Sequence, residues 1–228
     1  MLERRELVVE VPNRVRGVRD LQNEVGEGLH LRRRELGIAP QQADEGRVEL
    51  LERAVVVRFI RPEIRNPLSV EVLECLHGIV DNADKDRLLV FTGTEDVFAS
   101  GADLREISAL SAGSAREFSR RGQALMTKIS ERAAVAAING YCFGGALDLA
   151  LACKKRIATP NAMFSHPGAN LGIITGWGGT QRLPRLIGQA NALEMFFMAK
   201  RVGAAEALQI GLVDAIAEDA VDAALRGF

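Results

Sequence analysis

The sequence has few cysteines, little net charge and no long apolar run. Its three cysteines are an odd number set among apolar neighbours, which indicates reduced thiols and offers no spacing for a metal site. Lysine and arginine total 29 against 30 aspartates and glutamates, so the net charge of -1 argues against a dedicated nucleic-acid binder. Charges interrupt the opening MLERRELVVEV, and no uncharged run approaches bilayer length. We therefore expect a cytoplasmic, soluble protein with no metal, no nucleic acid and no membrane contact.

What is present is the composition of a folded protein. The chain has 228 residues, of which 47% are hydrophobic and 26% charged, which excludes wholesale disorder and a collagen-like fibre. Residues 1–47 differ from the rest, because they combine arginine runs, including Arg32-Arg33-Arg34, with interspersed acids and scattered aliphatic residues. Within them, 7–11 reads as an edge strand and 15–36 as an interrupted helix. We treat residues 1–47 as an appendage of unknown role, either a loosely docked extension or a binding arm.

Residues 48–228 form the second expected unit, in which short β-rich runs alternate with helical stretches, as in an α/β domain. The hydrophobic pattern predicts strands over 55–60, 88–94 and 133–140, and helices over 69–83, 114–130, 144–153 and 191–200. Residues 156–159 and 162–166 look like a short hairpin around Pro160-Asn161. Residues 202–216 read as a helix, a glycine stop and a strand.

Two glycine-containing loops lead from a predicted strand into a predicted helix. The first is VFASGADLREI (97–107) and the second is GYCFGGALDLA (140–150). Glycine allows a sharp turn and close approach of a ligand, and the unpaired N–H groups of a helix start favour a negatively charged oxygen. If the two loops converge, their amides can hold one oxyanion.

Five motifs in sequence order carry a resemblance to a known family. They are VRFIRPEIRNPLS, FTGTEDVFASGADLREI, AAINGYCFGGALDLALAC, GIITGWGGTQRLPRLIG and AAEALQIGLVDAI. Together they resemble the enoyl-CoA hydratase/isomerase (crotonase) superfamily over about residues 48–217. The resemblance implies an α/β fold of the ClpP/crotonase type, a spiral of stacked ββα units forming two nearly perpendicular sheets. It also implies an acyl-CoA substrate with no separate cofactor, and a homotrimer or dimer of trimers.

The resemblance also assigns site residues. It places the oxyanion-hole amides at Ala102 and Gly145, and the first of the hydratase's two catalytic glutamates at Asp148. It assigns binding of the acyl-CoA to Arg65, Ser100, Gly101, Asp103, Leu104, Gly144 and Trp177. For Arg65 the alternative is a solvated loop arginine with no role in binding. Trp177 and the loop 172–179 are expected to line or close the acyl pocket, with Tyr141 and Phe143 nearby. The chain stops soon after residue 216, so we expect a shortened C-terminal helical region and an open pocket, or a pocket covered by the N-terminal appendage.

Asp148 also stands out from the residues themselves. It is the only ionisable residue between Tyr141 and Cys153, and a carboxylate among apolar neighbours is either paired or functionally poised. The alternative is a first-turn aspartate stabilised by its own helix. The resemblance places the second glutamate at Gly168, which has no side chain, and glycine also occupies position 176, where dienoyl isomerases have an acid. His166 is a possible substitute if its strand continues through Pro167.

The expected function is that of an enzyme of fatty acid metabolism, a lyase or isomerase of the enoyl-CoA hydratase/isomerase type. It would stabilise an enolate at Ala102 and Gly145, with Asp148 as acid or base. Hydration normally uses two carboxylates, so double-bond isomerisation or decarboxylation fits better. One alternative is a catalytically degenerate acyl-CoA-binding or scaffold protein. Another, ranked last, is a nucleic-acid partner acting through Arg32-Arg33-Arg34.

Overall fold

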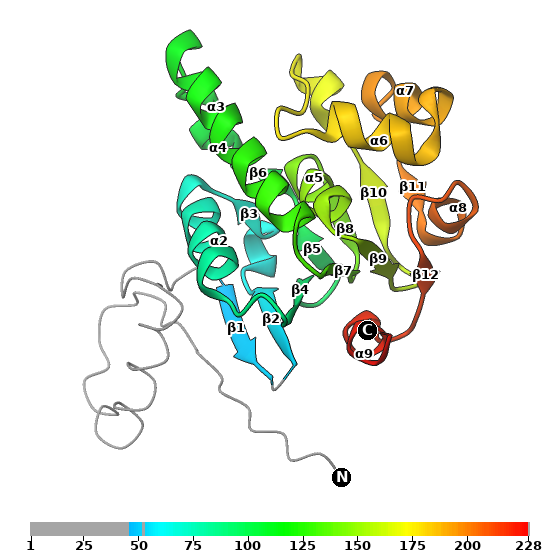
Figure 1. Ribbon diagram of the computed structural model, residues 1–228. Coiled ribbons are helices and arrows are strands. Elements are labelled where there is room, and N and C mark those ends of the chain that lie inside the picture. Colours follow the sequence, from blue (N-terminus) through cyan, green and yellow to red (C-terminus); the bar gives the residue numbers. More distant parts are fainter. Residues whose placement is uncertain (1–45, 52, 228) are drawn as a thin grey trace.

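The computed structural model describes residues 46–51 and 53–227, and its centre is a six-stranded sheet (Figure 1). The strand order is β1-β2-β4-β7-β9-β12. β1 and β2 pair antiparallel, and every later neighbour pairs parallel. The strands are β1 (Gly46–Leu50), β2 (Ala54–Phe59), β4 (Leu88–Thr92), β7 (Ala134–Ile138), β9 (Lys155–Ala158) and β12 (Ala215–Ile216).

A second sheet of four short strands has the order β11-β10-β8-β5. These strands are β11 (Val202–Gly203), β10 (Met163–Ser165), β8 (Tyr141–Phe143) and β5 (Val97–Ala99). A third, two-stranded sheet pairs β3 (Pro67–Leu68) parallel with β6 (Gly101–Ala102). The structure is therefore the mixed α/β architecture that the alternating pattern predicts.

Eight α-helices and two 3-10 turns connect the strands of the described chain. They are η1 (Pro62–Ile64), α2 (Val70–Asn82), α3 (Leu104–Ser108), α4 (Ala112–Ser130), α5 (Gly145–Ala152), η2 (Pro167–Leu171), α6 (Gly179–Ile187), α7 (Gln189–Phe197), α8 (Ala204–Gln209) and α9 (Ala220–Arg226). Side-chain caps fix several starts; for example, Ser69 accepts a hydrogen bond from the N–H of Val72 at the start of α2. Within the described residues, no helix combines the length and the apolarity needed to span a bilayer.

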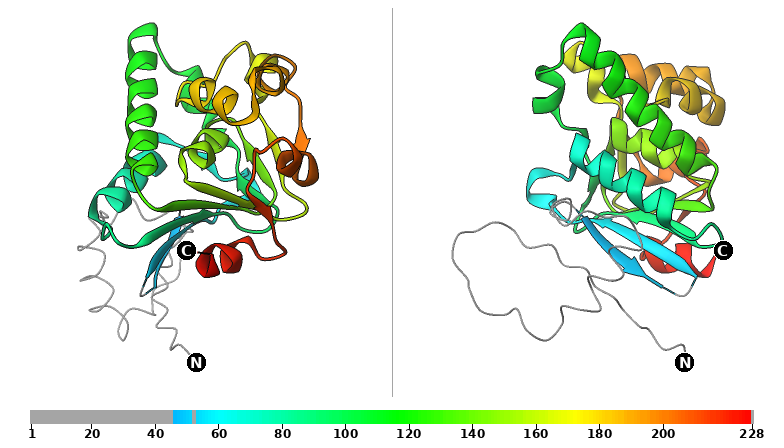
Figure 2. Two further views of the ribbon diagram at one scale, coloured as in Figure 1. Left: turned by 45° about the vertical axis from the view of Figure 1, so that its right-hand side comes forward. Right: turned by 60° about the vertical axis from the view of Figure 1, so that its left-hand side comes forward.

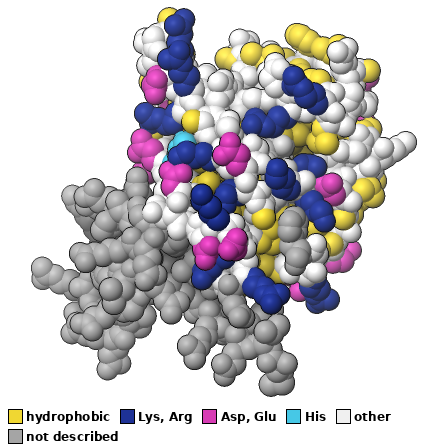
Figure 3. Space-filling model, in the orientation of Figure 1, with side chains coloured by type: hydrophobic (Ala, Val, Ile, Leu, Met, Phe, Trp, Pro, Cys, Tyr) yellow, Lys and Arg dark blue, Asp and Glu magenta, His cyan; other side chains and the backbone are white. Residues whose placement is uncertain are grey.

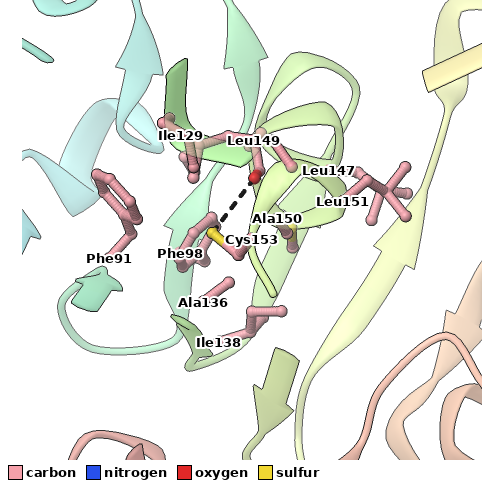
Figure 4. Packing of buried hydrophobic residues seen from close by; sticks show 14 of the residues in the cluster. Phe91, Phe98, Ile129, Ala136, Ile138, Leu147, Leu149, Ala150, Leu151 and Cys153 are labelled. Carbon is pink, nitrogen blue, oxygen red and sulfur yellow. Dashed lines mark hydrogen bonds between the residues drawn. The ribbon is translucent and has the colours of Figure 1, made fainter. Parts of the chain in front are cut away.

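The two faces of the six-stranded sheet are covered by different helices. Alternate side chains of β2 point to opposite sides, so Val55 and Val57 join the main core while Ala54 and Val56 join a smaller one. Helices α2, α4 and α5 contribute to the main core, and α9 covers the opposite face (Figure 2). Figure 4 shows the main core, where Phe91, Phe98 and Ile138 from the strands lie beside the buried side chains of α5. This packing holds the start of α5 in a fixed place.

Most of the predicted elements are confirmed. The strands predicted over 55–60, 88–94 and 133–140 are β2, β4 and β7, and each predicted helix is present with shifts of a few residues at its ends. The segment 179–187, which the pattern left unassigned, is helix α6. The boundary at 47/48 falls within β1, and that division of the chain remains a prediction. The strand at 7–11 and the helix at 15–36 lie outside the described residues.

The predicted hairpin of residues 156–159 and 162–166 is wrong. β9 lies in the six-stranded sheet between β7 and β12, whereas β10 lies in the other sheet between β8 and β11. The turn at Pro160-Asn161 exists, but each flanking strand pairs parallel with an earlier part of the chain. Local turn chemistry identifies the bend, and long-range pairing decides where the two strands go.

Candidate active site

A largely apolar cavity of about 250 Å³ lies between α3, α4, the start of α5 and the segment 166–177. Its walls combine backbone of the two glycine-containing loops with aliphatic and aromatic side chains. The lining residues are Ser100, Ala102, Leu104, Ile107, Leu110, Ala115, Phe118, Ser119, Gly144, Gly145, His166, Pro167, Gly168, Ala169, Leu171, Ile173, Ile174, Thr175, Gly176, Trp177 and Phe196. Among these described residues, His166 is the only one with an ionisable imidazole, amine or carboxyl group.

The structure brings together the two backbone segments that the sequence singled out. Ala102 at the end of β6 and Gly145 at the start of α5 line the same cavity. Gly101 has φ +93° and lies so close to the second loop that an added Cβ would be 2.7 Å from the backbone N of Gly145. Gly145 is the first residue of α5, so its N–H has no partner within the helix and lies at the positive end of the dipole. This arrangement suits an anionic oxygen.

Asp148 is fully buried on α5 and does not line the cavity. Its Oδ2 accepts hydrogen bonds from the hydroxyl of Thr175 and from the N–H of Trp177, the latter at 3.2 Å. Its Oδ1 has no hydrogen-bond partner. Burial raises the pKa of Asp148 to about 6, and its contacts with the Thr175 hydroxyl and with the backbone of Trp177 and Gly179 oppose that rise. The carboxyl group behind the cavity wall therefore keeps its proton to a higher pH than an exposed aspartate does.

His166 stands between Asp148 and the cavity. Its side chain is buried but contributes to the cavity wall, and its ring packs against the ring of Phe196 with centroids 4.9 Å apart. Its Nε2 lies 3.7 Å from Oδ1 of Asp148, and both atoms are buried without a hydrogen-bond partner. Burial lowers the pKa of His166 to about 4. At neutral pH the pair is therefore an ionised carboxylate beside a neutral imidazole.

By the resemblance, Gly168 occupies the position of the second catalytic glutamate in hydratases. At this position the structure has no room for a side chain. An added Cβ would lie 2.6 Å from the carbonyl oxygen of Ile173, because the N–H of Ile173 bonds back to the carbonyl of Gly168 at 3.0 Å. β10 ends at Ser165, and the 3-10 turn η2 starts at Pro167. The strand therefore does not continue through Pro167, as it would have to for strand alternation to place His166 and Gly168 on one face. Both His166 and Gly168 nevertheless line the cavity.

Trp177 lines the cavity and is almost wholly buried, as expected for this loop. Its indole lies against two glycines, Gly122 on α4 and Gly145 on α5, at both of which an added Cβ would overlap the ring. Phe118 packs beside it with centroids 5.5 Å apart. Tyr141 and Phe143, expected nearby, contact each other edge to face, with ring centroids 5.4 Å apart, and do not line the cavity. Trp177 thus closes the cavity next to the start of α5.

The residues assigned to acyl-CoA binding fall into two groups. Ser100, Leu104, Gly144 and Trp177 line the cavity, and Gly101 supports it from behind. Arg65 and Asp103 do not line it.

Arg65 is exposed on the turn after η1, where its carbonyl accepts a hydrogen bond from the N–H of Ser100 at 2.9 Å. Asp103 caps α3 and pairs with Arg105 at 2.7 Å, which holds the pKa of Asp103 below its ordinary value. The binding roles of these residues remain predictions.

Sequence reasoning missed two groups of site residues. Thr175 orients Asp148 through a hydroxyl, and nothing in GIITGWGG marks that threonine in advance. Phe118 and Phe196 complete the walls from α4 and α7. Their positions follow from helix packing, which the periodic pattern of each helix does not reveal.

Comparisons with known proteins agree on one family. A family profile described as Enoyl-CoA hydratase/isomerase matches residues 51–225. A crotonyl-CoA hydratase of Syntrophomonas wolfei is 39% identical over 75% of this chain and 68% of its own length. A short-chain-enoyl-CoA hydratase of Clostridium acetobutylicum is 35% identical over 73% of this chain and 66% of its own length. The chain therefore spans about two thirds of the length of these curated relatives.

Solved structures show the same likeness. Pseudomonas aeruginosa DspI superposes with a TM-score of 0.75 at 35% identity, covering 80% of this chain and 78% of the other. An enoyl-CoA hydratase from Bacillus anthracis superposes with a TM-score of 0.74 at 32% identity, covering 80% of this chain and 76% of the other. The similarity extends over the strands and helices that build the cavity.

Proposed function

The chain belongs to the enoyl-CoA hydratase/isomerase family, and we propose that it binds an acyl-CoA thioester and stabilises the enolate of its acyl group. The amides of Ala102 and Gly145 would hold the thioester oxygen as negative charge builds on it. Proton transfer would use the Asp148–His166 pair. Ser100, Leu104, Gly144 and Trp177 would contact the acyl-CoA, and Gly101 would support the loop behind the cavity wall. Arg65 and Asp103 would bind the part of the acyl-CoA that lies outside the cavity.

One observation supports this proposal most strongly: the two loops that offer backbone amides line a single cavity. Preorganised donors aimed at one oxygen stabilise an enolate in a site that excludes water, and removal of one such donor typically costs about 3 kcal/mol. The cavity walls are otherwise mostly apolar, which suits an acyl chain. The relatives named as crotonyl-CoA and short-chain-enoyl-CoA hydratases point to the same class of substrate.

Within this class, migration of a double bond fits the site better than hydration. Isomerisation of a 3-enoyl thioester to a 2-enoyl thioester removes a proton from C2 and returns one to C4, which a single acid/base group can do. Hydration must also activate a water, normally with a second carboxylate, and the backbone of Ile173 occupies the space beside Gly168. Decarboxylation of a carboxylated thioester would use the same oxyanion hole, so it remains within the proposal.

The test is to mix the full-length protein with a 3-enoyl-CoA and, separately, with crotonyl-CoA. We expect formation of the 2-enoyl product from the first and slower or no hydration of the second. Calorimetry with a saturated acyl-CoA measures binding in the same preparation. Turnover of neither substrate, with acyl-CoA binding intact, would reject both activities.

A second function is favoured by the sparse acid/base equipment of the cavity. With His166 as its single ionisable lining group among the described residues, the site also suits a catalytically degenerate acyl-CoA-binding or scaffold protein. That function predicts an increase in melting temperature with acyl-CoA and no chemistry on any thioester. The turnover assay above separates the two functions.

A further inference from the structure

Two buried polar atoms face each other at the cavity wall without any hydrogen bond. They are Oδ1 of Asp148 and Nε2 of His166, 3.7 Å apart. Buried polar atoms are rarely left unpaired, and a pair of unsatisfied atoms at a cavity often marks a functional site. A shift of less than 1 Å would bring them within hydrogen-bonding distance.

The other contacts of the two residues hold them in this arrangement. Thr175 and the N–H of Trp177 fix Oδ2 of Asp148, which leaves Oδ1 directed toward the imidazole. Phe196 packs on the imidazole ring. Gly179 leaves space for the carboxylate, because a Cβ at this position would overlap Oδ1 of Asp148. The carboxylate is therefore confined behind the ring, and the ring itself contributes to the cavity wall.

We propose that His166 is the catalytic acid/base of this site and that Asp148 is a positioning residue that acts through it. This inference rests on the proposed function. Once Nε2 and Oδ1 close from 3.7 Å to hydrogen-bonding distance, the carboxylate accepts a hydrogen bond from Nε2–H, which fixes the tautomer in which Nδ1 carries a free lone pair. The same carboxylate then stabilises the imidazolium that forms during proton transfer.

The proton transfer balances within the site. Nδ1 removes a proton from C2 of a 3-enoyl thioester, and the electron pair of the C–H bond moves through C1 to the carbonyl oxygen. The resulting dienolate is held by the amides of Ala102 and Gly145. The imidazolium then returns the proton to C4 as the electrons shift back, which leaves a double bond between C2 and C3 and a neutral imidazole. No co-reactant is required.

The activity test compares His166→Gln with His77→Gln in isomerisation of a 3-enoyl-CoA. His77 lies on α2, bonded to the carbonyl of Arg121 and outside the cavity, so it is the matched control. We expect His166→Gln to lower kcat about 100-fold or more and His77→Gln to leave it unchanged. A His166→Gln enzyme within about threefold of the wild-type kcat would overturn the catalytic role while the proposed function stands.

A spectroscopic test does not depend on turnover or on a stable His166 variant. In the wild-type protein with isotope-labelled histidine, NMR reports which ring nitrogen of each of the three histidines carries a proton. We expect His166 to be protonated at Nε2 only, and Nδ1 to shift when butyryl-CoA is added. Asp148→Asn should abolish the tautomer preference, and Asp81→Asn, at an exposed carboxylate, should not.

The two tests separate failures of different claims. A tautomer unaffected by Asp148→Asn would overturn the positioning role. An Nδ1 resonance that does not move with bound butyryl-CoA would overturn the contact with substrate. Absence of wild-type turnover on a 3-enoyl-CoA, with the tautomer held by Asp148, would instead reject the proposed function and the catalytic role that rests on it, leaving only the pair's geometry.

Discussion

Asp148 and His166 respond to pH in opposite senses. Burial raises the pKa of Asp148 from 3.8 to about 6, so the folded protein holds this proton more tightly and stability from Asp148 falls as pH rises through that range. Burial lowers the pKa of His166 from 6.5 to about 4, so the unfolded chain holds that proton more tightly and stability from His166 falls as pH drops. The two slopes nearly cancel in the wild-type protein.

A variant that lacks one of the two residues should show the pH dependence of stability that the other residue causes. Because His166 remains, we expect the free energy of unfolding of Asp148→Asn itself to fall by on the order of 3 kcal/mol between pH 6.5 and pH 4. His166→Gln should gain a similar amount, on the order of 3 kcal/mol, between pH 6 and pH 4. Arg182 and Cys142 are other charged or titratable groups near Asp148, and both are unchanged in these variants.

Urea denaturation at a series of pH values measures these differences. Asn82→Ala, which removes an exposed side chain that does not titrate, is the control, and its curve should run parallel to that of wild type. Parallel curves for Asp148→Asn as well would contradict the burial-driven shifts.

At this scale the sequence predicted part of the site. Asp148 was identifiable because it is an isolated acid in an apolar helix, and the absent carboxylate at Gly168 was identifiable by motif position. The contact between Asp148 and His166 was not predictable, because it depends on how α5 and the end of β10 meet. Strand alternation was the wrong guide for His166, since β10 ends at Ser165.

At the scale of elements, Trp177 is the contact between α4, α5 and the loop before α6. Its ring is almost wholly buried against Gly122 and Gly145. Both helices approach the indole closely because these positions have no side chain. The loop 172–178 therefore has a rigid anchor at the cavity wall.

This packing predicts that Gly122→Ala changes stability in opposite directions with and without the Trp177 side chain. Gly122→Ala should destabilise the wild-type protein by about 1–3 kcal/mol, because the added methyl overlaps the indole. In a Trp177→Ala background the overlap is gone, and the same substitution should stabilise by up to about 1 kcal/mol through helix propensity.

Chemical denaturation of the four proteins of this double-mutant cycle gives the coupling energy. Gly113→Ala on the same helix, where an added Cβ meets only Ser111 Oγ at 3.9 Å, is the matched control. Equal effects of Gly122→Ala in both backgrounds would show that the indole does not constrain α4.

Helices and buried strands were predictable from local periodicity, and strand partners were not. The run 133–138 is apolar throughout and contains β7 (Ala134–Ile138), which is buried on both sides. The segments on either side of Pro160-Asn161 carry the pattern of a hairpin, yet they pair with β7 and β8 in different sheets. Strand pairing depends on which earlier strands have a free edge, and a local sequence pattern does not contain that information.

At the scale of the whole molecule, the two sheets and their helices bring β6 and the start of α5 to one cavity. The ClpP/crotonase type of fold was predictable because five motifs occur in order along the chain. The oligomeric state remains a prediction, with a trimer or dimer of trimers expected.

Hydrophobic side chains gather over α6 and α7 in Figure 3, and Leu193, Phe197 and Met198 are more than half exposed. Light scattering on the full chain would show whether its mass is a multiple of 24.7 kDa.

Formation of an enolate requires only the two amides and one base, so its most direct measurement is hydrogen exchange at C2 of a saturated thioester. We would incubate butyryl-CoA with the protein in heavy water and follow the C2 protons by NMR. We expect exchange at least about 100-fold faster than without protein. Exchange no faster than the uncatalysed rate, with butyryl-CoA bound, would show that this site does not form an enolate.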